Sequence, residues 1–551
     1  MTTSRRDFLL RSSLLFGSAF VPNIFSPRAS IFSRGDYSDS SPIININSFK
    51  ATDIISGDTP DEAHEIFWNK DGFIKKKGGY PNASQKYDVV IIGGGLSGIS
   101  SALHLIKNGM KVLILEGHPR LGGNAKAEMY KNTLMSLGSA YTTIPEKDGP
   151  IDNLYKDLGI EKLFKKTRKE DEPIAIHGKI KNGFWSGASD PKNADQFINV
   201  HKKLNDIYEN AYPELPLIPG LDVDRTLLNS YDKQKFNEWV NKEIPGIHPH
   251  IDEYFHQYCW SSFGCAYDDI SAAQALNFIT SDLQGIQALP GGNAIIAKAM
   301  IDKIKDGNLT VLNSTFVCDI IDEDNSVYVC FHQDNKILNA VRANKVIVTA
   351  PKMVAKHIIS NLPKENYKAM DDMRYHAYLV ANVILKKNIK PKYYDLYSLI
   401  EKIPTNEHED SKNRVFSDMT FANWANQDQA ENSALTLYLP LPYDMAQQFL
   451  FSPILYSKYS GRIDKAINPF LNDLNLNESD IDGIRLTRYG HALPVACSNG
   501  LASGLFERAH QPINDKVFFA NQDNWANPCF ETCYATGLVA AYQAMGKEIE
   551  L

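Results

Sequence analysis

The chain has 551 residues, of which 43% are hydrophobic and 22% are charged, and its formal net charge at pH 7 is −7. This length and composition are typical of a globular protein with more than one domain, and the mild acidity argues against a nucleic-acid partner. The seven cysteines form no CxxC pair and no CxxCH haem-attachment motif, which argues against a disulfide framework, and no metal site is predicted.

The N-terminus is the first informative segment. Residues 4–10 read Ser-Arg-Arg-Asp-Phe-Leu-Leu, and a short apolar run follows between Leu14 and Val21. Consecutive arginines ahead of such a run resemble a twin-arginine export signal. We therefore expect residues 1–30 to be recognised by the export machinery and the protein to be periplasmic. The alternatives are an uncleaved signal that anchors the protein at the membrane, or a basic tail with a chance arginine pair.

Residues 31–85 are polar and irregular, and we expect them to form a linker that wraps the outside of the fold. Regular structure then begins with a β-α-β unit. The apolar run Val89–Ile92 is typical of a buried parallel strand, and apolar residues recur at helical spacing from Ile99 to Ile106. The run Val112–Leu115 predicts the second strand.

The turn between the first strand and the helix fits the GxGxxG fingerprint of dinucleotide-binding units, with Gly93, Gly95 and Gly98 as its glycines. Gly93 permits the tight turn, Gly95 lets the backbone approach a pyrophosphate, and Gly98 allows the helix to pack closely on the sheet. The N–H groups at the helix start, around Leu96 and Ser97, favour the charge of a phosphate. The sequence therefore predicts a dinucleotide site at this turn.

Glu116 ends the second strand, where its carboxylate can accept hydrogen bonds from ribose hydroxyls and would repel a 2′-phosphate. FAD and NAD share the fingerprint, and the segment that separates them is Arg120-Leu121-Gly122-Gly123. A strand-end acid followed by RxGG resembles the flavin-containing amine oxidase superfamily, in which this segment runs along the FAD diphosphate. The resemblance implies FAD as the cofactor, bound by Arg120, Gly122, Gly123 and the adjoining Asn124.

Two further segments extend this resemblance. Residues 289–293 precede a helix, like the central glycine turn of the superfamily, and Val317 on the following strand matches a valine whose backbone meets the adenine. Residues 346–351 resemble the family strand that ends in A-x-P.

The closing FAD motif of the superfamily reads FAGE or FAGD and is followed by SGxxAA. Residues 517–523 and 536–541 resemble it, but Asn521 and Gln522 replace the Gly-acid pair, and Asp523 supplies the acid one place late. The resemblance implies that Asp523 contacts FAD, with the identity of the contact in doubt.

The sequence thus predicts an α/β fold in which a Rossmann-type FAD-binding domain carries a discontinuous α+β substrate domain. We expect the FAD-binding domain to comprise residues 86–145, 285–355 and 481–551. The substrate domain is expected to comprise residues 146–284, which are largely helical in pattern, and residues 356–480.

Several departures from the superfamily pattern resemble the bacterial spermidine dehydrogenases. The stretches GGNAK, PGGNA and ANQD look like GGHAK, PDGNA and ANSD of that branch. Some of its members carry haem b, but no motif here supports haem. Asn382 stands where many amine oxidases have a lysine that holds a water at flavin N5, which implies a slow reaction with oxygen. The electron acceptor is unknown, and the resemblance implies one other than NAD.

The resemblance implies a small-molecule substrate, an amine or polyamine, that is oxidised by hydride transfer to flavin N5. Residues 488–494 resemble the segment that reaches the flavin, so Tyr489 and His491 are candidate catalytic residues, together with Trp525 after the closing motif. The alternative is that these aromatic residues fill the core. Glu531 is either an anchor for a distal ammonium or an ordinary acid in the first turn of a helix.

Two other functions share the same FAD segments. One is a polyene or lipid desaturase or saturase of the phytoene-desaturase-like type, which needs a long apolar tunnel. The other is a flavoprotein with a non-catalytic role. The scattered charges of residues 146–284 count against the first of these.

The arginine pair makes the export route testable. Changing Arg5 and Arg6 together to Lys should leave the protein in the cytoplasm, because twin-arginine export depends on the pair itself rather than on its charge. Immunoblots of periplasmic and cytoplasmic fractions give the readout. An unchanged periplasmic yield of the double-Lys variant contradicts the assignment.

Overall fold

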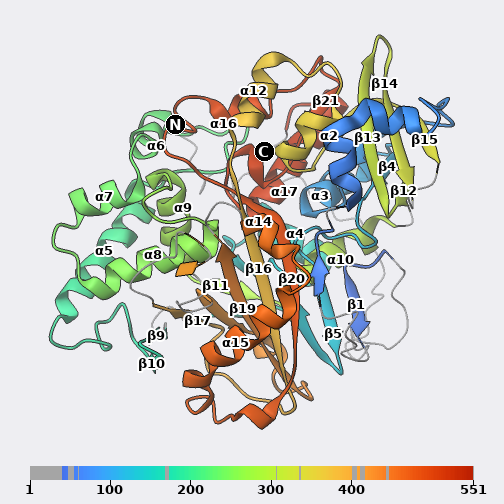
Figure 1. Cartoon of the computed structure of the whole chain (residues 1–551). Helices are drawn as coiled ribbons and strands as arrows, with labels where there is room; N and C mark the ends of the chain where they lie inside the picture. Colours follow the sequence, from blue (N-terminus) through green and yellow to red (C-terminus); the bar gives the residue numbers. More distant parts are fainter. Residues whose placement is uncertain are drawn as a thin grey trace.

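The computed structural model describes residues 40–46, 55–59, 61–167, 173–305, 307–333, 337–399, 406, 408–409, 416–441 and 446–549. The export signal expected at residues 1–30 lies outside this part of the chain. The described residues form an α/β fold around two large sheets, which confirms the expected fold class (Figure 1). None of their helices is both long and apolar enough to cross a membrane.

The first large sheet contains the strands predicted for the dinucleotide-binding unit. Its centre is parallel, because β3 lies between β4 and β15 in the same direction, and β12 and β21 continue this arrangement. Two antiparallel strands extend its other edge. In spatial order the strands are β12 (Leu309–Leu312), β4 (Val112–Leu115), β3 (Lys86–Ile92), β15 (Leu338–Val348), β14 (Ser326–Gln333) and β13 (Thr315–Glu323), with β21 (Val517–Phe519) beside the end of β15.

Three helices pack together on this sheet: α3 (Leu96–Lys107), α10 (Ala294–Ile304) and α17 (Phe530–Met545). The contact between α3 and α17 is close because small residues form it. Ser101 donates to the carbonyl of Gly537 at 3.0 Å, and a Cβ on Gly537 would lie 2.5 Å from the Ser97 carbonyl oxygen. Thr536-Gly537 of the closing motif lies at this contact, and it thus fixes α17 against α3.

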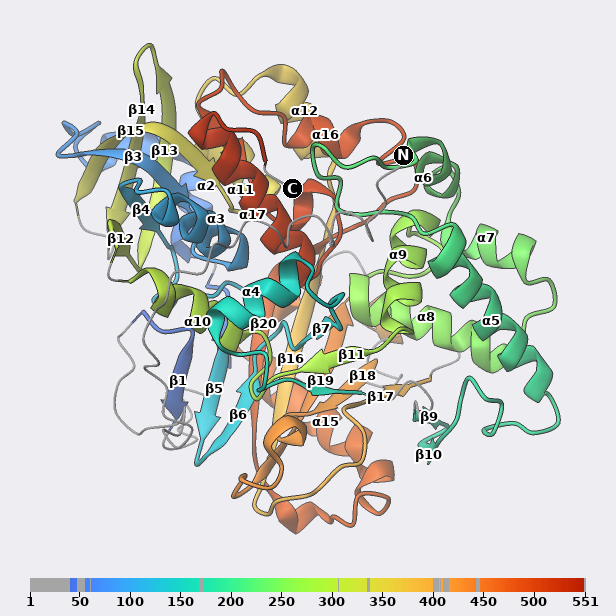
Figure 2. The same ribbon diagram turned by 180° about the vertical axis from the view of Figure 1, so that it is seen from behind.

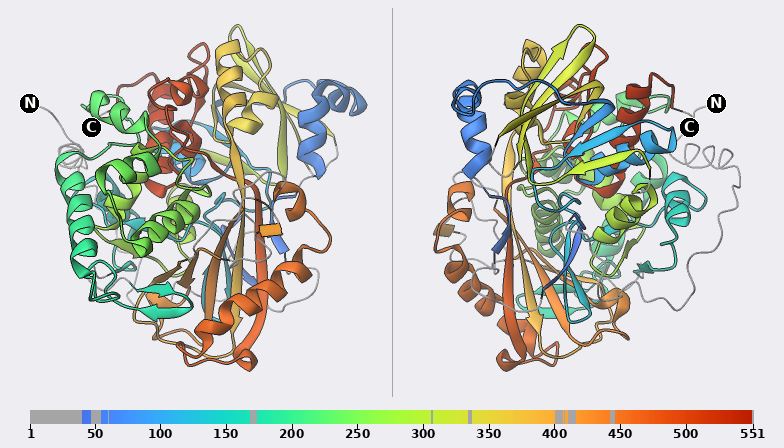
Figure 3. Two further views of the ribbon diagram at one scale, coloured as in Figure 1. Left: turned by 60° about the vertical axis from the view of Figure 1, so that its left-hand side comes forward. Right: turned by 90° about the vertical axis from the view of Figure 1, so that its right-hand side faces the viewer.

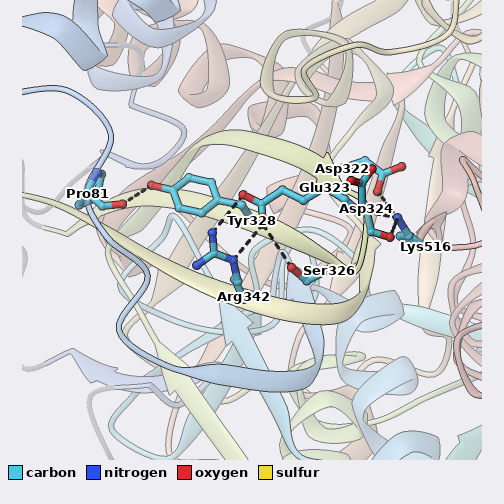
Figure 4. A network of polar contacts seen from close by, with 8 residues as sticks. All are labelled: Pro81, Asp322, Glu323, Asp324, Ser326, Tyr328, Arg342 and Lys516. Atoms are coloured by element: carbon cyan, nitrogen blue, oxygen red, sulfur yellow. Dashed lines mark hydrogen bonds and ion pairs between the residues drawn. The ribbon is translucent and has the colours of Figure 1, made fainter.

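The hairpin of β13 and β14 is tied down at its tip by charged side chains (Figure 4). Arg342 on β15 donates to Glu323 at 2.9 and 3.1 Å. Lys516, just before β21, donates to the Asp322 carboxylate at 2.7 Å. Tyr328 donates to the Pro81 carbonyl at 2.6 Å. These bonds join the hairpin to β15 and to the segments that precede β3 and β21, and so hold in place the strand that carries Val317.

The second large sheet has eight strands, with β16 and the long strand β20 near its centre. Residues 481–551 are expected in the FAD-binding domain, but β20 at the start of this range pairs with β16 in the eight-stranded sheet. The apolar side chains of β20, such as Leu486, pack into the core of this sheet. In spatial order the strands are β10 (Lys179–Lys181), β9 (Ile174–Ile176), β17 (Asp395–Ser398), β18 (Asp418–Phe421), β19 (Ser433–Leu441), β16 (Tyr375–Leu385), β20 (Ile481–Pro494) and β2 (Ile55–Gly57).

Residues 146–284 are mainly helical, as the sequence predicts, and most of their helices gather on one side of the second sheet (Figures 1 and 2). Buried aromatic residues such as Phe184, Phe236 and Tyr254 form their shared core. The helices are α4 (Pro150–Leu158), α5 (Ala194–Asn210), α6 (Arg225–Asp232), α7 (Phe236–Glu243), α8 (Pro249–Phe263) and α9 (Ala272–Asp282).

The segment before β3 is more regular than expected. It contributes β1 (Ile43–Ile46), which pairs with β5 (Ala127–Tyr130), and α2 (Asp61–Lys76). Apolar residues of α2 such as Phe73 and Ile74 pack on the β13–β14 hairpin, so this helix lies at the edge of the molecule (Figure 3). Polar and charged residues are frequent in this helix, so its amphipathic pattern is weak, and the sequence therefore did not predict it.

Short elements complete the described part of the chain. They are β6 (Thr133–Ser136), β7 (Tyr141–Thr143), β8 (Lys165–Lys166), β11 (Ile286–Ala288), α11 (Lys352–Ile358), α12 (Lys364–Asp372), α14 (Ala446–Leu450), α15 (Leu455–Leu471) and α16 (Leu505–Ala509), with the 3₁₀ turns η2 (Trp424–Asn426), η3 (Glu478–Asp480) and η4 (Gln522–Asn524).

Candidate active site

A cavity of about 620 Å³ is bounded by both large sheets. The glycine turn after β3 and the end of β4 contribute part of its wall, and strands β16 and β20 contribute another part. Residues 57–67, expected only to wrap the outside, also line it through Ala63, His64, Ile66 and Phe67. The cavity therefore joins the predicted dinucleotide site to the predicted substrate side.

The glycine turn has the geometry that the fingerprint predicts. Gly93 has a φ of +107°, which favours glycine, and a Cβ on Gly98 would lie 2.1 Å from the Gly93 carbonyl oxygen. Gly95 is the N-cap of α3, and no side chain caps the helix there. Because Gly95, Leu96 and Ser97 line the cavity, the N-terminus of α3 is open to a ligand. Gly98 itself packs behind the wall.

Glu116 lies at the cavity wall with a fixed orientation. One carboxylate oxygen accepts from the Gly94 amide at 2.6 Å and the other from the His118 amide at 2.7 Å. Val317 lines the same cavity from β13. The structure therefore brings together the residues predicted for the ribose and the adenine.

The second glycine pair lies directly against the first turn. The Gly122 amide donates to the Gly94 carbonyl at 2.7 Å, and Gly122, Gly123 and Asn124 all line the cavity. Arg120 differs from the expectation, because it is not among the lining residues. Its guanidinium is buried and donates to the Ala127 carbonyl at 3.2 Å. Attraction to the buried Glu128 favours this orientation.

The altered closing motif has a partner that the sequence analysis missed. The Lys352 ammonium is fully buried and donates to the side-chain oxygens of Asn521 at 2.8 Å and Asn524 at 2.6 Å. Asp523 lines the cavity and accepts from the Lys352 amide at 2.9 Å and from the Tyr375 hydroxyl at 2.6 Å. Burial lowers the pKa of Lys352 to about 8 and raises that of Asp523.

The candidate catalytic residues separate into two groups. Tyr489 and His491 on β20 line the cavity, and the Tyr489 hydroxyl donates to the Leu137 carbonyl at 2.8 Å. Burial lowers the pKa of His491 to about 4, so its imidazole is neutral at pH 7. Trp525 is not among the lining residues. Its ring packs edge-on against His510, 4.8 Å between centroids, so the structure places it behind the wall.

Asn382 also lies away from the cavity wall. Its amide donates to the Ser136 carbonyl at 3.0 Å, and its oxygen accepts from Thr436 at 2.6 Å. It joins β16 to β6 and β19, whereas Tyr378 and Val380 of the same strand line the cavity. Matching the sequence to a family pattern cannot show which side chains of a strand face the cavity and which face away from it.

Part of the wall combines carboxylates with tyrosines. This acidic chamber is formed by Asp282, Asp418, Glu531, Tyr141, Tyr397 and Tyr438, all of which line the cavity.

Asp282 is the most constrained acid of the chamber. It accepts from the hydroxyls of Tyr258 at 2.7 Å and Tyr141 at 3.1 Å, and burial raises its pKa to about 7. Glu531 fits both of its predicted roles, because it lies in the first turn of α17 and also faces the cavity. One of its oxygens accepts from Thr143 at 2.7 and 3.0 Å. Asp282 had no local sequence signal, since tertiary contacts create its environment.

Across the described ranges, no group of three or more His, Cys, Asp or Glu side chains is arranged to hold a metal ion.

Comparison with known proteins gives one family. The model of the flavin containing amine oxidoreductase family matches residues 96–449. Oxidoreductase PigB of Serratia sp. (strain ATCC 39006) is 23% identical over 525 residues, covering 83% of this chain and 74% of that protein. (S)-6-hydroxynicotine oxidase of Paenarthrobacter nicotinovorans is 24% identical over 292 residues, covering 50% of this chain and 62% of that protein.

Solved structures share the fold. Putrescine oxidase bound to putrescine superposes with a TM-score of 0.59 at 13% identity, covering 84% of this chain and 99% of that one. Cyclohexylamine oxidase from Brevibacterium oxydans IH-35A gives a TM-score of 0.59 at 15% identity, covering the same shares.

The glycine turn allows binding and folding to be tested separately. A Cβ on Gly95 would meet only the Gly123 Cα, at 3.7 Å, so Gly95→Ala should fold normally while its methyl group obstructs the approach of a diphosphate. We expect flavin content to fall severalfold, measured by absorbance, while the flavin-free forms of the variant and the wild type melt at the same temperature by circular dichroism.

Gly98→Ala is the matched contrast. Its Cβ would clash with the Gly93 carbonyl at 2.1 Å, which should destabilise the fold by about 1–3 kcal/mol. Full flavin content in a stably folded Gly95→Val protein contradicts the assignment of this turn.

Proposed function

Because the chain belongs to the flavin-containing amine oxidoreductase family, we propose that it oxidises a diamine or polyamine and passes the electrons to an acceptor other than NAD. Membership of this family makes the protein a flavin-dependent oxidoreductase with FAD as its cofactor. The second amine of the substrate rests on the chemistry of the cavity, and the kind of acceptor rests on the sequence resemblance to the spermidine dehydrogenases.

The residues present fit FAD. The α3 N-terminus opens on the cavity through Gly95, Glu116 is held in place to accept from a ribose, and Gly122 and Gly123 leave room beside them. Bound FAD would supply the hydride acceptor for the carbon next to the amine nitrogen. The chain itself has to bind the amine and orient that carbon, and the nitrogen has to be unprotonated, since only the neutral amine reacts.

The acidic chamber is the observation that carries the substrate proposal. Carboxylates and tyrosines that line a cavity attract a cation, because they offer negative charge and aromatic faces. A polyene or lipid would leave the charge of these carboxylates uncompensated, which costs free energy. A second ammonium, distant from the reacting nitrogen, would compensate it.

His491 suits the reacting end of the substrate. Its imidazole lines the cavity and is neutral at pH 7, because burial lowers its pKa to about 4, so it adds no positive charge that would repel the amine and can hydrogen-bond to it. The Tyr489 hydroxyl is committed to the Leu137 carbonyl, which leaves its ring to shape the wall. We assign both His491 and Tyr489 the role of positioning the substrate.

The comparisons support an amine rather than a polyene. The fold neighbours include enzymes named for putrescine and cyclohexylamine, and one relative is named for a hydroxylated nicotine. The export signal proposed for residues 1–30 would place the oxidation in the periplasm.

Anaerobic bleaching of the flavin tests the substrate class. Diamines and polyamines should reduce the bound flavin faster than monoamines of equal length, and the optimum should be alkaline because a free amine, with a pKa of roughly 10, must lose its proton. Reoxidation by a quinone or an artificial dye should be faster than by oxygen. If a carotenoid or an unsaturated lipid bleaches the flavin and no amine does, the desaturase alternative replaces this proposal.

Asp282 gives the second test of this proposal. Its pKa is raised to about 7, so the carboxyl is mostly protonated at pH 6 and mostly ionised at pH 8. The KM for a diamine should therefore fall between these pH values. Asp282→Asn should abolish this fall and raise that KM at pH 8 by about tenfold or more, since hydrogen bonds to charged groups contribute about 1.5–3 kcal/mol.

Monoamine kinetics provide the control, because they should change little in Asp282→Asn. Asp302→Asn, which removes a half-exposed carboxylate from α10, should leave the kinetics of both substrates unaffected. Equal losses for monoamine and diamine in Asp282→Asn would exclude a distal-ammonium role.

The raised pKa of Asp282 also predicts how stability depends on pH. The folded carboxyl stays protonated up to about pH 7, whereas an unfolded Asp ionises near about 3.9. The wild type should thus lose stability relative to Asp282→Asn as pH rises from 4 to 7.

A further inference from the structure

Lys126 is a buried lysine whose side chain has no role in the proposed function. It is the last residue of the GGNAK stretch and immediately precedes β5. Its side chain is 8% exposed and lines the cavity together with Gly122, Gly123 and Asn124. A Cβ on Gly122 would lie 3.2 Å from the Lys126 Cγ, so the lysine side chain runs along the glycine pair.

The ammonium of Lys126 has no hydrogen-bond or ion-pair partner among the residues that the structure describes. Glu116 and Asp58 attract it from a distance, but burial outweighs them and lowers its pKa to about 8. Lysine is rarely buried without a partner, because removing its charge from water costs several kcal/mol. An anion bound beside Lys126 would offset this cost.

The surroundings identify the kind of anion. The Gly122 amide donates to the Gly94 carbonyl at 2.7 Å, which brings the glycine pair against the turn that starts α3. Lys126 and the uncapped α3 N-terminus therefore contribute positive charge to the same part of the cavity. The Lys126 ammonium and the helix amides would both attract a diphosphate, and Glu116 beside them is held by the Gly94 and His118 amides.

We propose that Lys126 binds the diphosphate of FAD, the role that the sequence had suggested for Arg120. Arg120 cannot fill this role in the observed geometry, since its guanidinium donates to the Ala127 carbonyl behind the cavity wall. The inference requires FAD, which family membership provides, and is independent of which amine or acceptor the protein uses.

The test compares Lys126→Met with Lys126→Arg and with Lys131→Met, which removes an exposed lysine five residues further on. Lys126→Met should weaken FAD binding about tenfold or more, whereas Lys126→Arg retains most of the affinity and Lys131→Met retains all of it. Equilibrium dialysis measures FAD binding. Riboflavin, which lacks the diphosphate, serves as the matched ligand, and its affinity should be the same in Lys126→Met and the wild type.

Phosphorus NMR of the purified holoproteins gives a readout that does not depend on activity or on flavin release. The two diphosphate resonances should shift in Lys126→Met and Lys126→Arg but not in Lys131→Met. Should Lys126→Met fail to fold, Lys126→Arg still decides, because a guanidinium changes the hydrogen bonds at the phosphate. Unshifted resonances in a folded Lys126 variant, or equal losses of FAD and riboflavin affinity, overturn the proposal.

Discussion

The close approach of two backbone segments is the constraint on which the cofactor side of this structure depends. The Gly122 amide reaches the Gly94 carbonyl, and a Cβ on Gly123 would lie only 2.9 Å from the Gly95 Cα. A side chain at Gly123 would push the segments apart. Glycine at this position keeps the α3 N-terminus open and the GGNAK stretch beside it, where we propose that a phosphate meets helix amides and a lysine together.

Buried charge divides the cavity into two chemically different parts. Lys126 and the start of α3 make one part suitable for an anion, and the acidic chamber around Asp282 makes another part suitable for a cation. Burial is costly for both Lys126 and Asp282, and it lowers the pKa of Lys126 to about 8 and raises that of Asp282 to about 7. A ligand group of opposite charge would offset this cost at each position, which is why we propose that these groups determine where cofactor and substrate bind.

Sequence motifs predicted the residues whose role lies in the backbone more reliably than those whose role lies in a side chain. Gly93, Gly95, Gly122 and Gly123 occur where the fingerprint places them, since local chain geometry sets their conformation. Arg120 and Trp525 match by position but point away from the cavity. Their orientation depends on Glu128, His510 and other partners that are distant in the sequence.

The sequence by itself determined the β-α-β unit, the glycine turn, the strand-end acid Glu116 and the likeness to flavin-dependent enzymes. Short-range periodicity and steric rules encode all of these. Only the tertiary structure decided that β20 joins the second sheet, that α2 lines the cavity, and that Asp282 meets two tyrosines. Long-range packing brings such groups together and removes them from water, and the resulting desolvation and hydrogen bonding leave no pattern within any one stretch of the chain.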